Sequence, residues 1–347
     1  MSEIGNRLVY PAPLDFRDTD AERHEVAVRE VSEVLTGETE DGQRLSYLHV
    51  NRDFETEPPI ICIGSMFVDS GMAELKYAAY QRAATFPDRS ILLLDLPAHG
   101  QSDALTDAQY SEITVSRGLT RVARAEAEIA KRRLPDITQT VVYGESVGAR
   151  VALDFAQKIG EIGVEPLAVL GVEAIGLEKR LSVSVSGSYF LAEPRMHQVL
   201  YRDKGDYKIQ NSTYEAAFQD FKAELTRAVN FDQNILKMQL RVFKTDPRYI
   251  TMLFSNSPLA ADTGRQSLET LLEDQPKLPV RLVVGGLSRI CRWRHIHEWA
   301  ENLQANQPER LRFDVWPYDS HGVALAPQQP RLTATLKEVI GNLTTQG

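Results

Sequence analysis

Short apolar runs recur along the chain and predict the strands of a central sheet. They lie at 60–63, 91–94, 140–143, 167–172, 280–284 and 311–316, and Gly, Asp or Pro follows most of them. Segments with helical spacing of apolar residues separate these runs, at about 73–85, 107–133, 295–303 and 332–343. Strands that are apolar on both faces and alternate with helices are typical of a parallel sheet covered by helices on both sides.

The N-terminal part of the chain has a different pattern. Residues 1–25 are polar, and their apolar positions show no clear periodicity, so we expect a loosely packed N-terminal segment. From 25 to 50 apolar and polar positions alternate, and the turn Glu40-Asp41-Gly42 divides the segment. This alternation predicts an antiparallel pair of strands ahead of the parallel ones.

A long interruption separates two parts of the predicted sheet. Residues 178–276 contain many helical stretches rich in Tyr, Phe, Leu and Met, and strand signals lie on both sides of them. We therefore expect a core made of residues 1–177 and 277–347, with residues 178–276 inserted as a helical unit.

The pentapeptide Gly144-Glu145-Ser146-Val147-Gly148 lies between a predicted strand and a predicted helix. A sharp turn at this point requires small residues two positions either side of the serine, and both of those positions are glycine. Such a turn lifts the Ser146 hydroxyl clear of the sheet. It also directs the Val147 amide, at the start of the helix, toward an oxyanion formed on a substrate carbon. We interpret Ser146 as a nucleophile.

Composition narrows the class of protein. The chain has 347 residues and a formal net charge of -9 at pH 7, which argues against general binding of nucleic acid. We identify no secretory signal and no apolar run of the ~18 residues that a membrane span needs. The two cysteines, Cys62 in a predicted buried strand and Cys291 in a loop, indicate a reducing compartment more than a disulfide framework. We therefore expect a cytoplasmic protein.

Three blocks of the chain resemble the α/β-hydrolase superfamily. The first is Ile63-Gly64-Ser65-Met66, placed like the family's oxyanion loop, and the third is the pentapeptide around Ser146. The second, Asp95-Leu96-Pro97-Ala98-His99-Gly100-Gln101-Ser102-Asp103, is similar to the family's Asp-x-Pro-Gly-His-Gly-x-Ser block. The resemblance implies a mostly parallel eight-stranded sheet flanked by helices, with a helical cap inserted between strands 6 and 7. It also implies a Ser…acid…His triad in that chain order. The oxyanion donors would be the amides of Val147 and of Ser65 or Met66.

The same resemblance suggests the partners of Ser146. Of the seven histidines, His321 follows the last strand in a small-residue loop, as the family pattern requires, while the usual role of His99 is to shape its own loop. His295 and His297 point to different faces of a helix, so we expect them to be solvated and not to bind a metal.

The position of the triad acid departs from the pattern common in this superfamily. Most relatives carry it in the loop after strand 7, but residues 285–290 of this chain contain no carboxylate. Haloalkane dehalogenases place the acid after strand 6, where this chain has Glu173. A carboxylate at an apolar strand end is costly unless it is paired, so Glu173 is our candidate. Glu178 and Asp319 stay open as alternatives.

The sequence therefore predicts an esterase-type serine hydrolase that needs no cofactor or metal and acts on a small molecule. Carboxylic esters, thioesters and lactones with an apolar group are all compatible with an acyl-enzyme mechanism. Glu145 and Arg289 are candidate substrate-binding residues. Two alternatives remain. One is a non-catalytic binding protein that keeps the fold, and the other is an acyltransferase or C–C hydrolase with the same triad. The sequence does not indicate an oligomeric state.

Overall fold

The computed structural model describes most of residues 34–177 and most of residues 263–344. The described residues are 34–50, 57–65, 75, 78, 79, 82, 83, 85–116, 119–177, 263–286, 288, 291, 293–317 and 329–344. The candidate site residues Met66, Arg289 and His321 lie outside this set, as do the alternative acids Glu178 and Asp319. So do residues 178–262, which make up most of the predicted cap.

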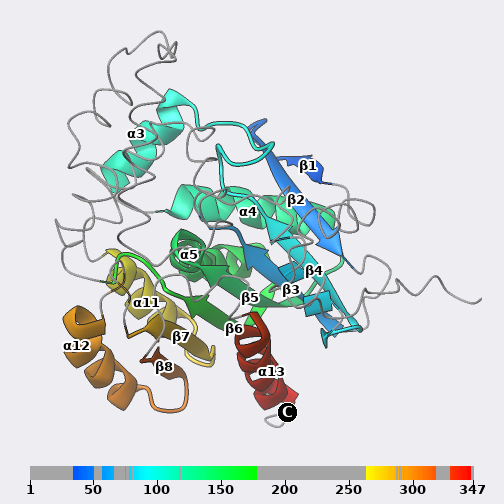
Figure 1. Cartoon of the computed structure of the whole chain (residues 1–347). Coiled ribbons are helices and arrows are strands. Elements are labelled where there is room, and N and C mark those ends of the chain that lie inside the picture. The colour runs from blue at the N-terminus through cyan, green and yellow to red at the C-terminus, as the bar shows by residue number, and fades with distance from the viewer. Residues whose placement is uncertain are drawn as a thin grey trace, which may run out of the picture.

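Eight strands form one sheet in the order β1-β2-β4-β3-β5-β6-β7-β8 (Figure 1). The strands are β1 (Leu35–Glu38), β2 (Arg44–Val50), β3 (Glu57–Ile63), β4 (Arg89–Leu94), β5 (Gln139–Glu145), β6 (Glu165–Val172), β7 (Val280–Gly285) and β8 (Leu311–Trp316). The pairs β1–β2 and β2–β4 are antiparallel, and all other neighbouring pairs are parallel. The mostly parallel eight-stranded sheet and its antiparallel start are thus confirmed.

Helices cover both faces of this sheet. They are α3 (Asp107–Ser116), α4 (Thr120–Arg133), α5 (Val147–Glu161), α11 (Thr263–Asp274), α12 (Trp293–Asn306) and α13 (Gln329–Thr344). One apolar cluster joins the sheet to α4, α5 and α11, and the second joins its other face to α13 and to Ala79 and Ala83. All residues of β4 are buried, which is why the central strands are apolar without alternation.

The helical pattern predicted at about 107–133 corresponds to two helices. Helix α3 ends at Ser116, and α4 begins at Thr120. The sequence contains Gly118 between them, and glycine inside a helix costs about 1 kcal/mol relative to alanine. Leu119, which caps α4, is fully buried in the core, so packing also favours a break here.

The last part of the range predicted for the cap packs on the core. Leu268 and Leu271 of α11 belong to the same apolar cluster as α5. The Gly264 amide donates to the Gly176 carbonyl at 3.0 Å, which ties the start of α11 to the segment after β6. The beginning of α11 and its buried leucines thus contact the core, while the division into a core of 1–177 and 277–347 and a cap of 178–276 stays a prediction.

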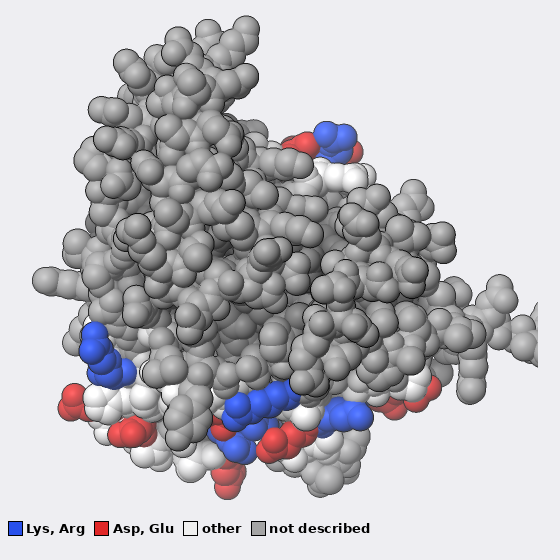
Figure 2. All heavy atoms as spheres, in the orientation of Figure 1, with Lys and Arg blue, Asp and Glu red and all other residues white. Residues whose placement is uncertain are grey.

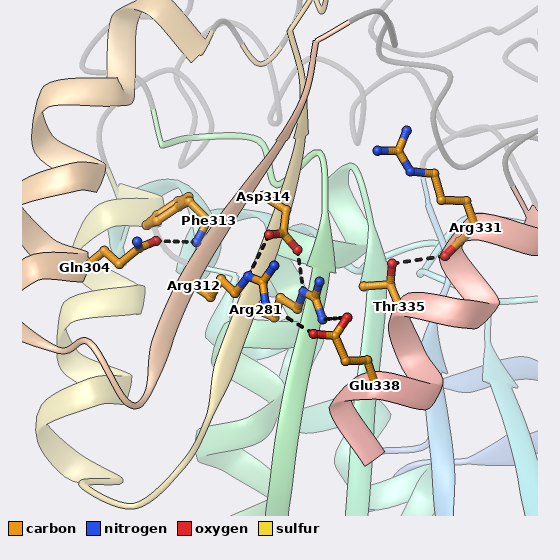
Figure 3. Close-up of polar contacts among 8 residues, drawn as sticks. All are labelled: Arg281, Gln304, Arg312, Phe313, Asp314, Arg331, Thr335 and Glu338. Carbon is orange, nitrogen blue, oxygen red and sulfur yellow. Dashed lines mark hydrogen bonds and ion pairs between the residues drawn. The ribbon is translucent and has the colours of Figure 1, made fainter. Parts of the chain in front are cut away.

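A network of two arginines and two carboxylates fastens α13 to the sheet (Figure 3). Arg281 on β7 pairs with Asp314 on β8 and, at 2.8 Å, with Glu338 on α13. Arg312 pairs with the same two carboxylates, at 2.8 Å and 3.2 Å. Hydrogen bonding to Arg281 is the main reason why the pKa of Glu338 lies below its usual value.

Figure 2 shows Lys and Arg side chains close to Asp and Glu side chains on the described surface along the lower edge of the view. Within the described ranges, we find no helix that is both long and apolar enough to cross a bilayer.

Candidate active site

Ser146 forms a sharp turn between β5 and α5. Its backbone has φ 55° and ψ -118°, a left-handed conformation that a residue with a side chain adopts only under strain. The Ser146 amide donates to the Val172 carbonyl at the end of the neighbouring strand β6, at 2.7 Å. The turn is thus anchored to the sheet at the residue where strain is concentrated.

The two glycines of the pentapeptide are required by close backbone contacts. A Cβ atom on Gly144 would lie 2.4 Å from the Gly148 carbonyl oxygen, and a Cβ atom on Gly148 would lie 2.3 Å from the Gly64 carbonyl oxygen. Both distances are far below any ordinary carbon–oxygen contact. Without side chains at these positions, the first turn of α5 can pack directly on the end of β3.

This contact brings together two segments that could hold an oxyanion. Hydrogen bonding within α5 begins where the Arg150 amide donates to the Ser146 carbonyl, at 3.2 Å. The Val147 amide therefore belongs to the first turn, where amides have no acceptor inside the helix. Gly64, whose amide donates to the Leu94 carbonyl at 2.8 Å, leads from β3 into the partly buried Ser65.

Glu173 lies directly after β6 and has a buried carboxylate. The residue is 1% exposed, and its φ of 55° is also left-handed. One carboxylate oxygen accepts the Gly285 amide, and the other accepts the Ser288 hydroxyl at 2.6 Å. Glu173 therefore extends from β6 to the beginning of the loop after β7. A charge this deeply buried is stable only with such partners.

Glu145, the residue before Ser146, points into the interior. It is 8% exposed, and its carboxylate accepts hydrogen bonds from the Tyr143 hydroxyl and, at 3.1 Å, from Arg82. Its predicted contact with substrate stays untested, but two of its interactions are with buried protein groups.

The loop of the second block, residues 95–103, is held firmly beside β2. Asp95 is fully buried and accepts the Ser46 hydroxyl at 2.5 Å. Ala98 has a φ of 62°, at the position where the family pattern has glycine. His99 is 3% exposed, and its Nδ1 donates to the Pro97 carbonyl at 2.8 Å, because a carbonyl can only accept. The His99 side chain therefore stabilises the conformation of this loop.

One described cavity, of about 360 Å³, lies beside Asp103 at the end of the 95–103 loop and away from the nucleophile turn. Its lining includes Gln43, Thr106, Gln109, Glu112 and Arg121, and neither Ser146, Ser65 nor Glu173 borders it. In the described part of the chain, no group of three His, Cys, Asp or Glu side chains is arranged to hold a metal ion.

The structure brings Ser146, Val147, Ser65 and Glu173 to one edge of the sheet, at the carboxyl ends of β3, β5 and β6. Sequence reasoning missed Ser288 and Arg82. Arg82 had a detectable signal, because it follows Ala78 and Ala79 at helical spacing on an otherwise apolar face. Ser288 had none, since a serine in a loop is ordinary.

Comparisons with known proteins agree with this architecture. The family model described as "Alpha/beta hydrolase family" matches residues 63–335. No curated protein matches the chain.

Solved structures match at low identity. A protein from Acinetobacter baumannii AYE, provisionally described as a lipase, is 14% identical with a TM-score of 0.61, over 98% of this chain and 100% of its own. The esterase RhEst1 from Rhodococcus sp. ECU1013 is 15% identical with a TM-score of 0.54, over 89% and 99%. The epoxide hydrolase VrEH1 from Vigna radiata is 11% identical with a TM-score of 0.53, over 90% and 99%. These likenesses concern the fold, and the family model covers most of the sequence. The chain belongs to the alpha/beta hydrolase family.

Proposed function

We propose that this protein is a serine hydrolase that cleaves a carboxylic ester through an acyl-enzyme formed on Ser146. The observation that carries the proposal is the backbone of Ser146, strained at φ 55° between a buried strand and the first turn of a helix. Strain of this kind persists where the surrounding structure enforces it, and here two glycine contacts and the bond to Val172 do so.

In the proposed reaction, His321 accepts the Ser146 proton while the serine oxygen attacks the carbonyl carbon of the substrate. The amides of Val147 and of Ser65 or Met66 donate to the oxyanion of the tetrahedral intermediate. His321 then protonates the departing alcohol, and a water molecule releases the acid by the same route in reverse.

Glu173 is the proposed acid of the triad. A base of this type needs an anion that fixes its tautomer and stabilises the imidazolium form. The position of its side chain supports this assignment. The Gly285 amide and the Ser288 hydroxyl bind the Glu173 carboxylate at the loop after β7, where most relatives carry their acid.

An ester substrate is favoured by the structural neighbours described as esterases. The fold also serves a protein described as an epoxide hydrolase, so the bond cleaved has to be tested directly. Thioesters and lactones pass through the same tetrahedral chemistry. We expect the proposed cap at 178–276, with its Tyr and Phe residues, to select an apolar acyl or ring group.

A fluorophosphonate probe tests the nucleophile, because it reacts covalently with an activated serine. The wild type should be labelled, and Ser146→Ala should be neither labelled nor active on an activated ester, with a loss of about 10⁶ in turnover. Ser111→Ala, which changes an exposed serine on α3, is the matched control and should behave as the wild type. A labelled Ser146→Ala variant would refute the proposal.

Product analysis then identifies the bond that is cleaved. Esters, thioesters and lactones of varied acyl length should release free acid when water is the sole acceptor. Faster transfer to an added alcohol or thiol than to water would indicate an acyltransferase instead.

A further inference from the structure

A buried polar cluster lies directly beneath the nucleophile turn. It consists of Cys62 on β3, Tyr143 and Glu145 at the end of β5, and Arg82. Each of the four residues is at most 8% exposed. The cluster lies on the sheet face that α13 covers, whereas α5 packs against the other face. The turn at Ser146 is therefore supported from two sides by different kinds of contact.

Arg82 contacts both strands that lead into the site. Its guanidinium donates to Glu145 at 3.1 Å and lies 4.2 Å from the centre of the Tyr143 ring. It also lies 4.0 Å from the sulfur of Cys62, which pairs with Tyr143 across β3 and β5. Glu145 is the residue before Ser146, and Cys62 is three residues before Ser65. One side chain thus spans the nucleophile strand and the strand of the proposed oxyanion loop.

The charges of this cluster balance one another. Burial by itself lowers the pKa of Arg82, but Tyr143, Cys62 and Glu145 raise it by more, so the guanidinium stays charged. Burial also raises the pKa of Tyr143 well above its usual value, so its hydroxyl remains a donor to Glu145. Two described groups therefore donate to the Glu145 carboxylate, and one of them is cationic. Removing Arg82 would take away the cationic one of these donors, so the Glu145 carboxylate would repel more strongly the negative charge that the tetrahedral intermediate develops near Ser146.

We propose that Arg82 is a positioning residue for the nucleophile, which acts through Glu145 to fix the backbone of Ser146 and to neutralise the carboxylate beside it. The proposal rests on the serine-hydrolase function proposed above. It assigns Glu145 to the support of the turn, and it predicts that both residues affect turnover more than substrate affinity.

The experiment compares Arg82→Met, Glu145→Gln and the double variant with the wild type. Methionine keeps an unbranched apolar side chain and removes the charge, and glutamine keeps the volume of glutamate. We expect Arg82→Met to lower kcat by about 10²-fold while KM stays nearly constant, since a small displacement of a reacting group has a cost of that size. The double variant should recover at least part of this loss, because the unbalanced carboxylate is then absent.

Tyr143→Phe is the milder companion variant, since it removes one donor to Glu145 and leaves the ion pair in place. It should lower kcat less than Arg82→Met does. Circular dichroism and melting temperatures of all variants identify the folded fraction to which each kcat refers.

Several results would overturn the proposal. The first is a rise in KM with unchanged kcat in Glu145→Gln, which would indicate contact with substrate. The second is a double variant that is slower than Arg82→Met, and the third is a loss of kcat that only follows the loss of folded protein. If the wild type itself is not labelled by the fluorophosphonate probe, the proposed function fails and the positioning role fails with it. A labelled wild type combined with a fully active Arg82→Met removes the positioning proposal alone.

Discussion

Replacing Gly148 by alanine should test the contact on which the site geometry depends. The new Cβ atom would lie 2.3 Å from the Gly64 carbonyl oxygen and 2.5 Å from that of Ile63. Both are backbone atoms, so they cannot rotate away as a side chain would. Since real Cβ atoms essentially never approach another heavy atom within 3.0 Å, the start of α5 and the end of β3 must separate by at least about 0.7 Å.

Such a displacement should affect stability and activity by different amounts. Forcing an extra carbon into a packed interior usually destabilises a protein by about 1–3 kcal/mol. The same shift moves the Val147 amide away from the Ser65 segment, so the two proposed oxyanion donors no longer converge. The loss of one such donor typically lowers kcat by about 10²–10³-fold. We therefore expect a folded protein with turnover reduced by that factor.

Gly160→Ala is the matched control, because it adds the same methyl group to the same helix. Its Cβ atom would lie 3.1 Å from the Gln275 side-chain amide, which can move, and at an ordinary contact distance of 3.9 Å from Pro166 Cδ. Alanine in place of glycine should stabilise α5 by about 0.5–1 kcal/mol and leave kcat unchanged. Denaturant unfolding measures the first quantity, and hydrolysis of an activated ester measures the second. Wild-type turnover in Gly148→Ala would refute the argument, and so would equal losses in both variants.

Three further predictions concern the acid, the ion network and the thiols. Glu173→Gln should stay folded, with kcat lower by about 10⁴-fold in steady-state kinetics, as for a triad without its anion; near-wild-type kcat would exclude this acid. Glu338→Gln should destabilise the protein by about 0.5 kcal/mol, because the carboxylate is 47% exposed and solvent weakens its pairing with Arg281. Because the pKa of Glu338 is lowered in the folded state, this difference should be fully present above pH 4.5 and be lost as pH falls through the lower pKa of the folded state. Urea titrations at pH 7 and at pH 3 measure the difference, and an undiminished difference at pH 3 would contradict the assignment. Burial raises the pKa of the Cys62 thiol to about 11, so neither Cys62 nor the buried Cys291 should react with a thiol reagent at pH 8 until denaturant is added; rapid labelling of the native protein would show otherwise.

Local sequence patterns were sufficient to predict most of the fold. Each apolar run predicted as a strand forms one. The runs in β3 to β7 are mostly buried on both faces, as strands inside a sheet are, whereas the edge strand β8 is partly exposed. The turn at Ser146 was equally local, since its glycines lie two residues on either side of the serine. The break between α3 and α4 was missed, because the apolar period continues across Gly118 and only the burial of Leu119 shows where the second helix begins.

Contacts between segments far apart in the chain could not be predicted from local sequence patterns. The sequence alone determined the alternation of strands and helices, the position of the nucleophile turn and a short list of carboxylates that included Glu173. Only the tertiary structure decided that Glu173 accepts bonds from Gly285 and Ser288, more than a hundred residues later in the chain. It also decided that Arg82 lies against Glu145. The physical reason is that hydrophobic periodicity reports which face of an element is buried, whereas the partner of a buried polar group depends on how separate elements pack.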